Sequence, residues 1–305
     1  MTVTFRKLHP CAGAEASAPD LRQVHDRATL DALVAGMDEY GVLVFRDQPF
    51  TDPEQLAFAE RFGGPLHAKP GVAALGKNRF ANDAIADISN IDEAGRIRRA
   101  DDRRRMYSLA NRLWHTDASF QNPAGRYSTL SARNLPPVGA DTEFADMRAA
   151  YDALDAAMKK EIECLHVHHS IAYSRQLLGF EFSAEELDRL KGAVHPLVRI
   201  NPRTHRRSLY LASHATRIIE MPLAEGRLLL RDLTEHATQR QYVYRHAWRD
   251  RDLVIWDNLA TMHRSTPFDD TTHRRELRRV TTLDVAAPEE VELPQTLSQY
   301  PAEAG

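Results

Sequence analysis

Short apolar strands separated by turns fill the C-terminal third of the chain, and this pattern limits the fold more than any other feature of the sequence. Residues 242–248 (YVYRHAW), 253–256 (LVIW) and 277–285 (LRRVTTLDV) are rich in β-branched and aromatic side chains. Residues 196–212 contain two further expected strands, joined by an Asn-Pro turn. Several short strands of this kind predict a β-sandwich or β-barrel core.

Helices are expected to flank this core. Apolar residues at helical spacing predict helices over about 30–37, over one long stretch from Asp146 to about Leu165, and over roughly 224–238. Two capping boxes predict further helices that begin at Thr51 and at Ser183. The run VLVF at 42–45 is expected to be a buried strand. The fold class is therefore mainly β with added helices.

The composition is that of an ordinary globular protein: 305 residues, 43% hydrophobic and 27% charged, with no Pro/Ser/Gly-rich linker. We expect a single domain over residues 1–305. The net charge of −3 gives no overall attraction to nucleic acid or to an anionic membrane. Without an apolar leader, a membrane span or a CxxC pair, the chain is expected to be cytoplasmic, with Cys11 and Cys164 as free thiols.

A candidate metal site begins at LWHTDASF, residues 113–120, where His115 and Asp117 stand two positions apart. This composition produces about two His-x-Asp or His-x-Glu pairs by chance, so the spacing alone favours a solvated polar pair. On a strand, however, residues i and i+2 point to the same face and could share one ion. His263, just beyond the strand at 253–256, is the best third ligand. Two histidines and a carboxylate leave coordination positions open, as in Fe(II) oxygenases, whereas zinc more often takes a closed or tetrahedral site.

The remaining histidines are weaker candidates. His166, His168 and His169 follow a helix without an accompanying carboxylate, which favours a structural or surface role. His205 and His273 stand among arginines, whose repulsion disfavours a bound cation.

A basic strand forms the second candidate site, at residues 273–284 (HRRELRRVTTLD). Arg275 and Arg279 share one face of this strand and lie roughly 13 Å apart along it. That separation is too large for one carboxylate and suits two different anions. The arginine fork binds carboxylates in a bidentate manner, which the distal end of a dicarboxylic cosubstrate requires. The alternative is a solvated basic strand.

Taken together, His115-x-Asp117, the distant His263 and Arg275 resemble the iron and 2-oxoglutarate signature of the TauD/TfdA family, which includes taurine and 2,4-dichlorophenoxyacetate dioxygenases. The resemblance covers nearly the whole chain, through GVLVFRDQP, FGGPLH, NRLWHTDASFQ, DTEFADMRAAYDAL, AEGRLLLRDLTEHATQRQYVYRHAW, DLVIWDN and RRELRRVTTLD. The chain looks most similar to the 2,4-dichlorophenoxyacetate branch. The family implies a double-stranded β-helix, or jelly roll, with flanking and inserted helices.

The resemblance also implies roles for individual residues. His115, Asp117 and His263 would be the catalytic ligands of Fe(II), while Thr142 and Arg275 would bind the distal carboxylate of 2-oxoglutarate. Arg279 would contact the acidic group of the substrate. The positions of Asn111 and Lys69 match residues that line the substrate pocket in such enzymes. Because the taurine enzymes have a histidine where Lys69 is placed, sulfonate specificity is in doubt.

The implied reaction is an oxidation that consumes O₂ and 2-oxoglutarate and yields succinate and CO₂, with ascorbate as an activator in vitro. With an aryloxyacetate substrate, hydroxylation of the ether CH₂ gives a hemiacetal that collapses to a phenol and glyoxylate, as in the degradation of aromatic herbicides. The same chemistry on an alkyl sulfonate, a sulfate ester or another small carboxylate is the first alternative. A small-acid binder without catalysis and a zinc hydrolase are others. A homo-oligomer remains compatible with the sequence.

Overall fold

The computed structural model describes residues 3–68, 79–80 and 82–285. Its largest sheet has the strand order β1-β2-β3-β13-β5-β15-β4 and is antiparallel except for the parallel pair β2 and β3. The strands of this major sheet are β1 (Thr4–Lys7), β2 (Ala14–Ser17), β3 (Val42–Phe45), β13 (Leu253–Asp257), β5 (Gly125–Asn134), β15 (Glu276–Leu283) and β4 (Ala86–Ser89).

Three smaller sheets complete the β-structure, all of them antiparallel. The minor sheet, β12-β6-β14, carries part of the candidate site. Its strands are β12 (Val243–His246), β6 (Thr142–Asp146) and β14 (Thr261–Ser265). A second small sheet contains β11 (Ala215–Ile218), β7 (His166–His169) and β8 (Ala193–Pro196). The third pairs β10 (Arg207–Leu209) with β9 (Val198–Ile200).

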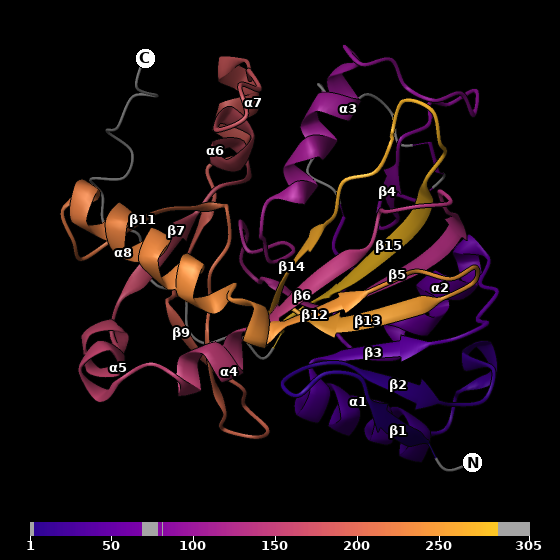
Figure 1. Ribbon diagram of the computed structural model, residues 1–305, viewed down its shortest axis with the longest axis horizontal. Helices are drawn as coiled ribbons and strands as arrows, with labels where there is room; N and C mark the ends of the chain where they lie inside the picture. The colour runs from indigo at the N-terminus through magenta and orange to yellow at the C-terminus, as the bar shows by residue number, and fades with distance from the viewer. Residues whose placement is uncertain (1–2, 69–78, 81, 286–305) are drawn as a thin grey trace.

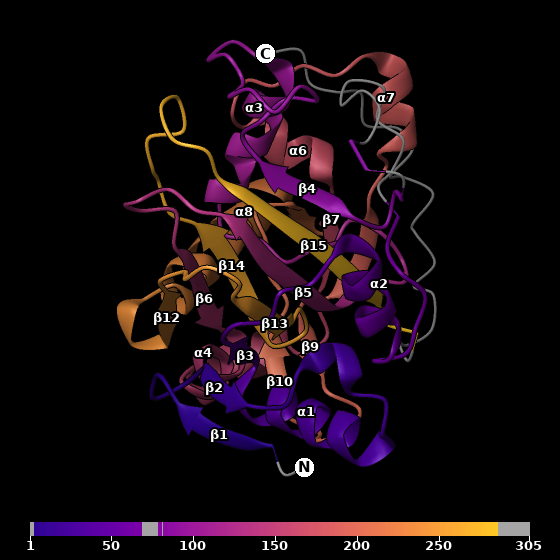
Figure 2. The same ribbon diagram turned by 90° about the vertical axis from the view of Figure 1, so that its right-hand side faces the viewer.

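Helices lie outside the sheets in both views (Figures 1 and 2). The α-helices are α1 (Arg27–Tyr40), α2 (Asp52–Glu60), α3 (Arg103–Ser108), α4 (Met147–Asp152), α5 (Ala156–Ile162), α6 (Ile171–Gln176), α7 (Ala184–Arg189) and α8 (Leu223–Ala237). Short 3₁₀ turns occur at η1 (Leu21–Gln23), η3 (Leu109–Arg112) and η4 (Arg240–Tyr242). The expected capping boxes at Thr51 and Ser183 are both present. Within the described ranges, no helix combines the length and the apolar character needed to cross a membrane.

The major and minor sheets pack face to face. Val44, Val254 and Trp256 of the major sheet form one buried cluster with Phe144 and Tyr244 of the minor sheet. Because side chains alternate along a strand, the neighbouring residues of each sheet point outward to the helices. The outer face of the major sheet is covered by α1 and α2, and the outer face of the minor sheet by α4 and α8. The expected β-core flanked by helices is therefore present as a mixed α/β structure with several antiparallel sheets.

The prediction of one long helix from Asp146 to about Leu165 is wrong, because the structure has two helices there. The stripe that begins near Asp146 does face the core, but the chain forms α4 and α5 with a break at residues 153–155. The break occurs because Asp155 acts as an N-cap: its carboxylate accepts a hydrogen bond of 2.8 Å from the backbone N–H of Met158. Leu154 remains packed against the core, so the apolar stripe continues through a turn that hydrophobic spacing does not reveal.

Candidate active site

Two histidines far apart in the sequence are joined by their backbones. His263 lies on β14, and His115 lies in the segment that precedes β5. The N–H of His115 donates to the carbonyl of His263 at 3.0 Å, and the N–H of His263 donates to the carbonyl of His115 at 2.8 Å. This isolated bridge sets the two imidazole rings side by side, with centroids 4.2 Å apart.

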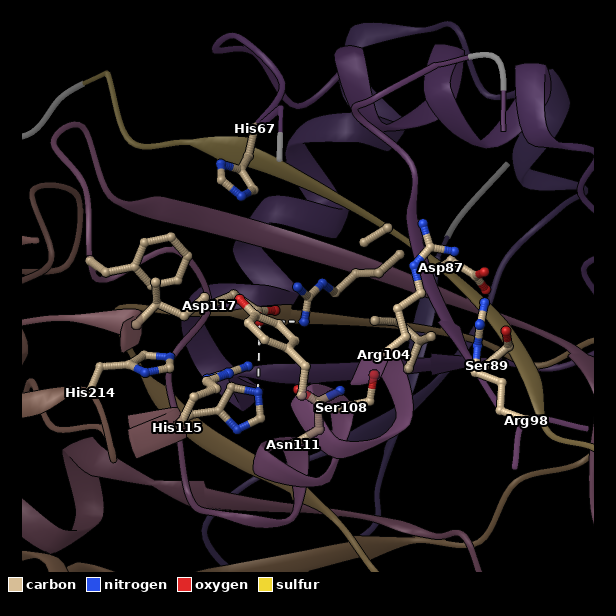
Figure 3. Close-up of a pocket in the computed structure, with 17 residues that line it drawn as sticks. His67, Asp87, Ser89, Arg98, Arg104, Ser108, Asn111, His115, Asp117 and His214 are labelled. Atoms are coloured by element: carbon tan, nitrogen blue, oxygen red, sulfur yellow. Dashed lines mark hydrogen bonds and ion pairs between the residues drawn. The ribbon is translucent and has the colours of Figure 1, made fainter. Parts of the chain in front are cut away.

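Asp117 completes a three-residue cluster. His115 Nε2 lies 3.9 Å from Asp117 Oδ1, and His263 Nε2 lies 3.7 Å from Asp117 Oδ2. All three side chains are buried, and their ligand atoms lie within 4.8 Å of one another. Figure 3 shows His115 and Asp117 among the side chains that line a pocket. In the part of the chain that the structure describes, this is the one such group of His, Cys, Asp or Glu side chains that could hold a metal ion.

The protonation of these residues suits a divalent metal. Burial lowers the pKa of His115 to about 4 and that of His263 well below its usual value, so both imidazoles are neutral near pH 7. His115 Nδ1 is 2.8 Å from the carbonyl oxygen of Leu113, which fixes the proton on Nδ1 and leaves Nε2 as a free ligand. Burial raises the pKa of Asp117 most, but Arg279, the two neighbouring histidines and the Ser128 hydrogen bond together outweigh it, and the pKa falls to about 2. Two neutral imidazoles and one carboxylate fit Fe(II) with open coordination positions.

A network of hydrogen bonds with Ser128 and Asn258 orients Asp117. The Ser128 hydroxyl donates to Asp117 Oδ2 at 2.8 Å, and the Asp117 backbone N–H donates to Asn258 Oδ1 at 3.1 Å. Asn258 Nδ2 in turn donates to Ser128 Oγ at 3.0 Å. Neither Ser128 nor Asn258 was assigned a role in the site from the sequence. The one available signal was the polar dipeptide Asp257-Asn258 directly after a strand that is apolar throughout.

Replacing Ser128 with alanine is expected to weaken metal binding by roughly tenfold, because Asp117 loses the hydrogen bond that orients its carboxylate. Titration of the metal-free protein with Mn(II) measures this change. Ser131→Ala is the matched control, since Ser131 lies on the same strand and its hydroxyl donates to Gln55 instead. Equal affinities in the two variants would contradict the role of Ser128.

A smaller cavity of about 370 Å³, including its open side, is lined by His115 and His263 and also by Arg275 and Thr142. Arg275 is 6% exposed, and among the described residues no carboxylate lies within ion-pair distance of its guanidinium. Burial lowers its pKa to about 10, and its Nε has no hydrogen-bond partner. Thr142 Oγ1 accepts a hydrogen bond of 3.0 Å from Trp248 Nε1 and keeps its own proton to donate. An anion in this cavity would pair with the buried cation.

A larger cavity of about 940 Å³, including its open mouth, is lined by His115 and Asp117 (Figure 3). The predicted residues Arg279 and Asn111 line both this cavity and the smaller one. Lys69 lies outside the described residues. The lining residues that the sequence did not identify include His67, Tyr107, Arg175 and His214. They come from four separate segments and share no spacing pattern that could have identified them.

The histidine run at 166–169 is structural, as expected. His166 Nδ1 lies 2.7 Å from Glu220 Oε1, and His168 Nδ1 lies 2.7 Å from Thr216 Oγ1. His169 is buried against the rings of His195 and Tyr210.

Comparison with known proteins identifies the class to which this fold and site belong. Residues 4–281 match the family model "Taurine catabolism dioxygenase TauD, TfdA family". The chain is 44% identical to the alpha-ketoglutarate-dependent 2,4-dichlorophenoxyacetate dioxygenase of Cupriavidus pinatubonensis, over 94% of this chain and 99% of that protein. It is 36% identical to the (S)-phenoxypropionate/alpha-ketoglutarate-dioxygenase of Sphingobium herbicidovorans, over 86% of this chain and 88% of that one.

A solved structure is similar throughout. The crystal structure of AAD-2 in complex with Mn(II) and N-oxalylglycine is 45% identical, with a TM-score of 0.89, and covers 93% of this chain and 98% of that chain. The chain therefore belongs to the TauD/TfdA family of 2-oxoglutarate-dependent dioxygenases, and it is an enzyme of that family. This confirms the resemblance inferred from the sequence and sets aside a non-catalytic small-acid binder and a zinc hydrolase.

Proposed function

We propose that this enzyme hydroxylates the ether CH₂ of an aryloxyacetate such as 2,4-dichlorophenoxyacetate, with cleavage to a phenol and glyoxylate. The observation that carries the proposal is a cavity with an arginine beside the candidate metal ligands, in a chain 44% identical to a 2,4-dichlorophenoxyacetate dioxygenase. The two packed sheets would correspond to the double-stranded β-helix expected from the sequence.

The three clustered residues would hold Fe(II), and the small cavity would hold 2-oxoglutarate. When bound, iron, 2-oxoglutarate and O₂ supply the oxidising chemistry and release succinate and CO₂. His115 and His263 would provide two neutral ligands and Asp117 one anionic ligand, which leaves coordination positions for the cosubstrate and O₂. Arg275 pairs with the distal carboxylate of the cosubstrate, and the Thr142 hydroxyl donates to it. That carboxylate supplies the anion which the buried Arg275 lacks.

Arg279 would bind the acidic group of the substrate. It lines both cavities and already contacts Asp117 Oδ1, so an anion bound to it lies next to the metal ligands. Phe120, Ile171 and Tyr107 give the larger cavity an apolar wall for an aromatic ring. Asn111 lines both cavities, and we propose that it contacts substrate there. Lys69 stays a proposed substrate-binding residue on the sequence alone.

A sulfonate or a sulfate ester is the second candidate substrate class, since the guanidinium fork of Arg279 also fits tetrahedral oxyanions. The two classes are separated by supplying the protein with Fe(II), ascorbate and 2-oxoglutarate and measuring succinate against a panel of phenoxyacetates, alkyl sulfonates and alkyl sulfates. Phenoxyacetates are expected to give succinate and a phenol in equal amounts. Turnover of the sulfur compounds alone would remove the aryloxyacetate proposal.

A further inference from the structure

The buried arginines of this protein fall into two groups. Five of the seven among the described residues pair with carboxylates within 4.0 Å: Arg98, Arg126, Arg148, Arg199 and Arg278. The other two, Arg275 and Arg175, have no carboxylate within that distance in the described ranges. A buried cation without a counter-ion is costly, so such a residue marks a place where an external anion binds. For Arg275 that anion is the cosubstrate of the proposed function, and Arg175 has no assigned partner.

The surroundings of Arg175 hold its guanidinium in place without neutralising it. The residue is 5% exposed and lies near the end of α6, on the wall of the larger cavity. Its Nη1 donates to Ser174 Oγ at 2.8 Å, and its guanidinium lies 4.6 Å from the centre of the Tyr107 ring. Its Nε has no hydrogen-bond partner. Both polar contacts of the guanidinium, with Ser174 and with the Tyr107 side chain, are therefore to neutral groups.

The charged groups that face Arg175 leave it short of negative charge. Burial lowers its pKa most, and Arg279 across the same cavity lowers it further. Tyr107 and Asp117 favour its charged form. Burial raises the pKa of the Tyr107 phenol, so that group is neutral, and the Asp117 carboxylate is already shared by Arg279 and the candidate metal site. His115 and His214, on the same wall, are buried and neutral. Two carboxylates line this cavity, and both are already committed: Asp117 as just described, and Asp87 to an ion pair with Arg79. Neither neutralises Arg175.

We propose that Arg175 is a second anion-binding residue of the substrate pocket, and that the acidic group of the substrate is held between Arg175 and Arg279. This inference rests on the proposed function and assigns its substrate a two-arginine clamp. A substrate carboxylate between the two arginines neutralises both guanidinium groups. It is held by side chains from α6 and β15 instead of from one element alone. The carbon next to that carboxylate is thereby held beside the metal ligands, because Arg279 also contacts Asp117.

The test is a direct binding measurement on protein loaded with Mn(II) and N-oxalylglycine, which cannot turn over. Calorimetric titration with phenoxyacetate is compared with its neutral analogue 2-phenoxyethanol in the wild type, Arg175→Met and Arg175→Lys. Because a charged hydrogen bond is lost, Arg175→Met is expected to bind phenoxyacetate at least about tenfold more weakly and 2-phenoxyethanol within about twofold of the wild type. Arg175→Lys, which keeps the charge, should retain part of the affinity for phenoxyacetate.

Thermal unfolding of the metal-free protein provides a second readout. Arg175→Met is expected to unfold at or above the temperature of the wild type, because an unpaired buried cation is removed. The matched control is Arg148→Met, which strands the buried carboxylate of Asp146 (2.8 Å from Arg148) and should lower the unfolding temperature. A fall in Arg175→Met as large as that in Arg148→Met, with unchanged affinity for phenoxyacetate, would make Arg175 a structural residue and overturn the inference.

The same titrations separate this inference from the proposed function. If the wild type binds hexanesulfonate or hexyl sulfate in place of phenoxyacetate, and Arg175→Met loses that binding, the aryloxyacetate class is wrong and the clamp stands. If Arg175→Met binds phenoxyacetate as tightly as the wild type, the clamp is wrong and the substrate class stands. If the wild type binds none of these anions, both are wrong.

Discussion

Replacing His263 with alanine is expected to reduce substrate-dependent succinate formation by on the order of a thousandfold or more, because one of three proposed metal ligands is removed. The fold should survive the change. The hydrogen bonds between His263 and His115 that position this strand are made by backbone atoms, which alanine also provides. The loss should therefore be one of metal binding in a folded protein, seen as weak or absent Mn(II) binding with unchanged circular dichroism.

His236→Ala is a suitable control for this prediction. His236 lies on α8, away from the cluster, where its Nε2 is 2.9 Å from the carbonyl oxygen of Ala150. Succinate formation in this control should stay close to the wild-type rate. Tight Mn(II) binding by His263→Ala would show that the metal is held elsewhere and would end the proposal for this site.

Replacing Arg275 with glutamine is expected to raise the KM for 2-oxoglutarate by about a hundredfold, since a buried, bidentate contact to its distal carboxylate is lost. The effect on kcat at saturating cosubstrate should be smaller, because Arg275 binds the end of 2-oxoglutarate that does not react. The affinity of the metal-loaded protein for N-oxalylglycine measures the same loss without turnover.

The neighbouring Arg274 provides the matched control, because it is exposed while Arg275 is 6% exposed. Arg274→Gln changes the net charge equally and should leave the KM for 2-oxoglutarate within about twofold of the wild type. An equal rise of KM in both variants would indicate a general charge effect and contradict the assigned role of Arg275.

Short spacing along the chain identified two pairs of site residues. His115 and Asp117 were paired on the expectation of a strand, which is wrong: His115 forms an isolated bridge and Asp117 lies in a turn, although the two side chains still meet. Arg275 and Arg279 were paired because strand residues i and i+4 share a face. His263 could be proposed because it follows a strongly apolar strand. The structure brings His115, Asp117 and His263 together and places Arg275 and Arg279 on the walls of the adjoining cavities.

Contacts that depend on packing between distant elements could not be predicted in this way. Ser128 reaches Asp117 from within β5 and Asn258 from the turn after β13, while Arg175 reaches the cavity from a helix of six residues. Each is a single residue of common type with no partner at a fixed spacing. The break between α4 and α5 was missed for a related reason: the apolar stripe continues through it, and the Asp155 cap alone marks the new helix. The single domain and the oligomeric state stay predictions.

The pair of backbone hydrogen bonds between His115 and His263 has a consequence for how the protein acquires its metal. Those two amides are shielded and should be among the slower ones to exchange with deuterium, even before any ion is added. The two imidazoles cannot separate unless these backbone hydrogen bonds break. Metal binding therefore uses a preorganised site and requires no ordering of the chain when the ion binds.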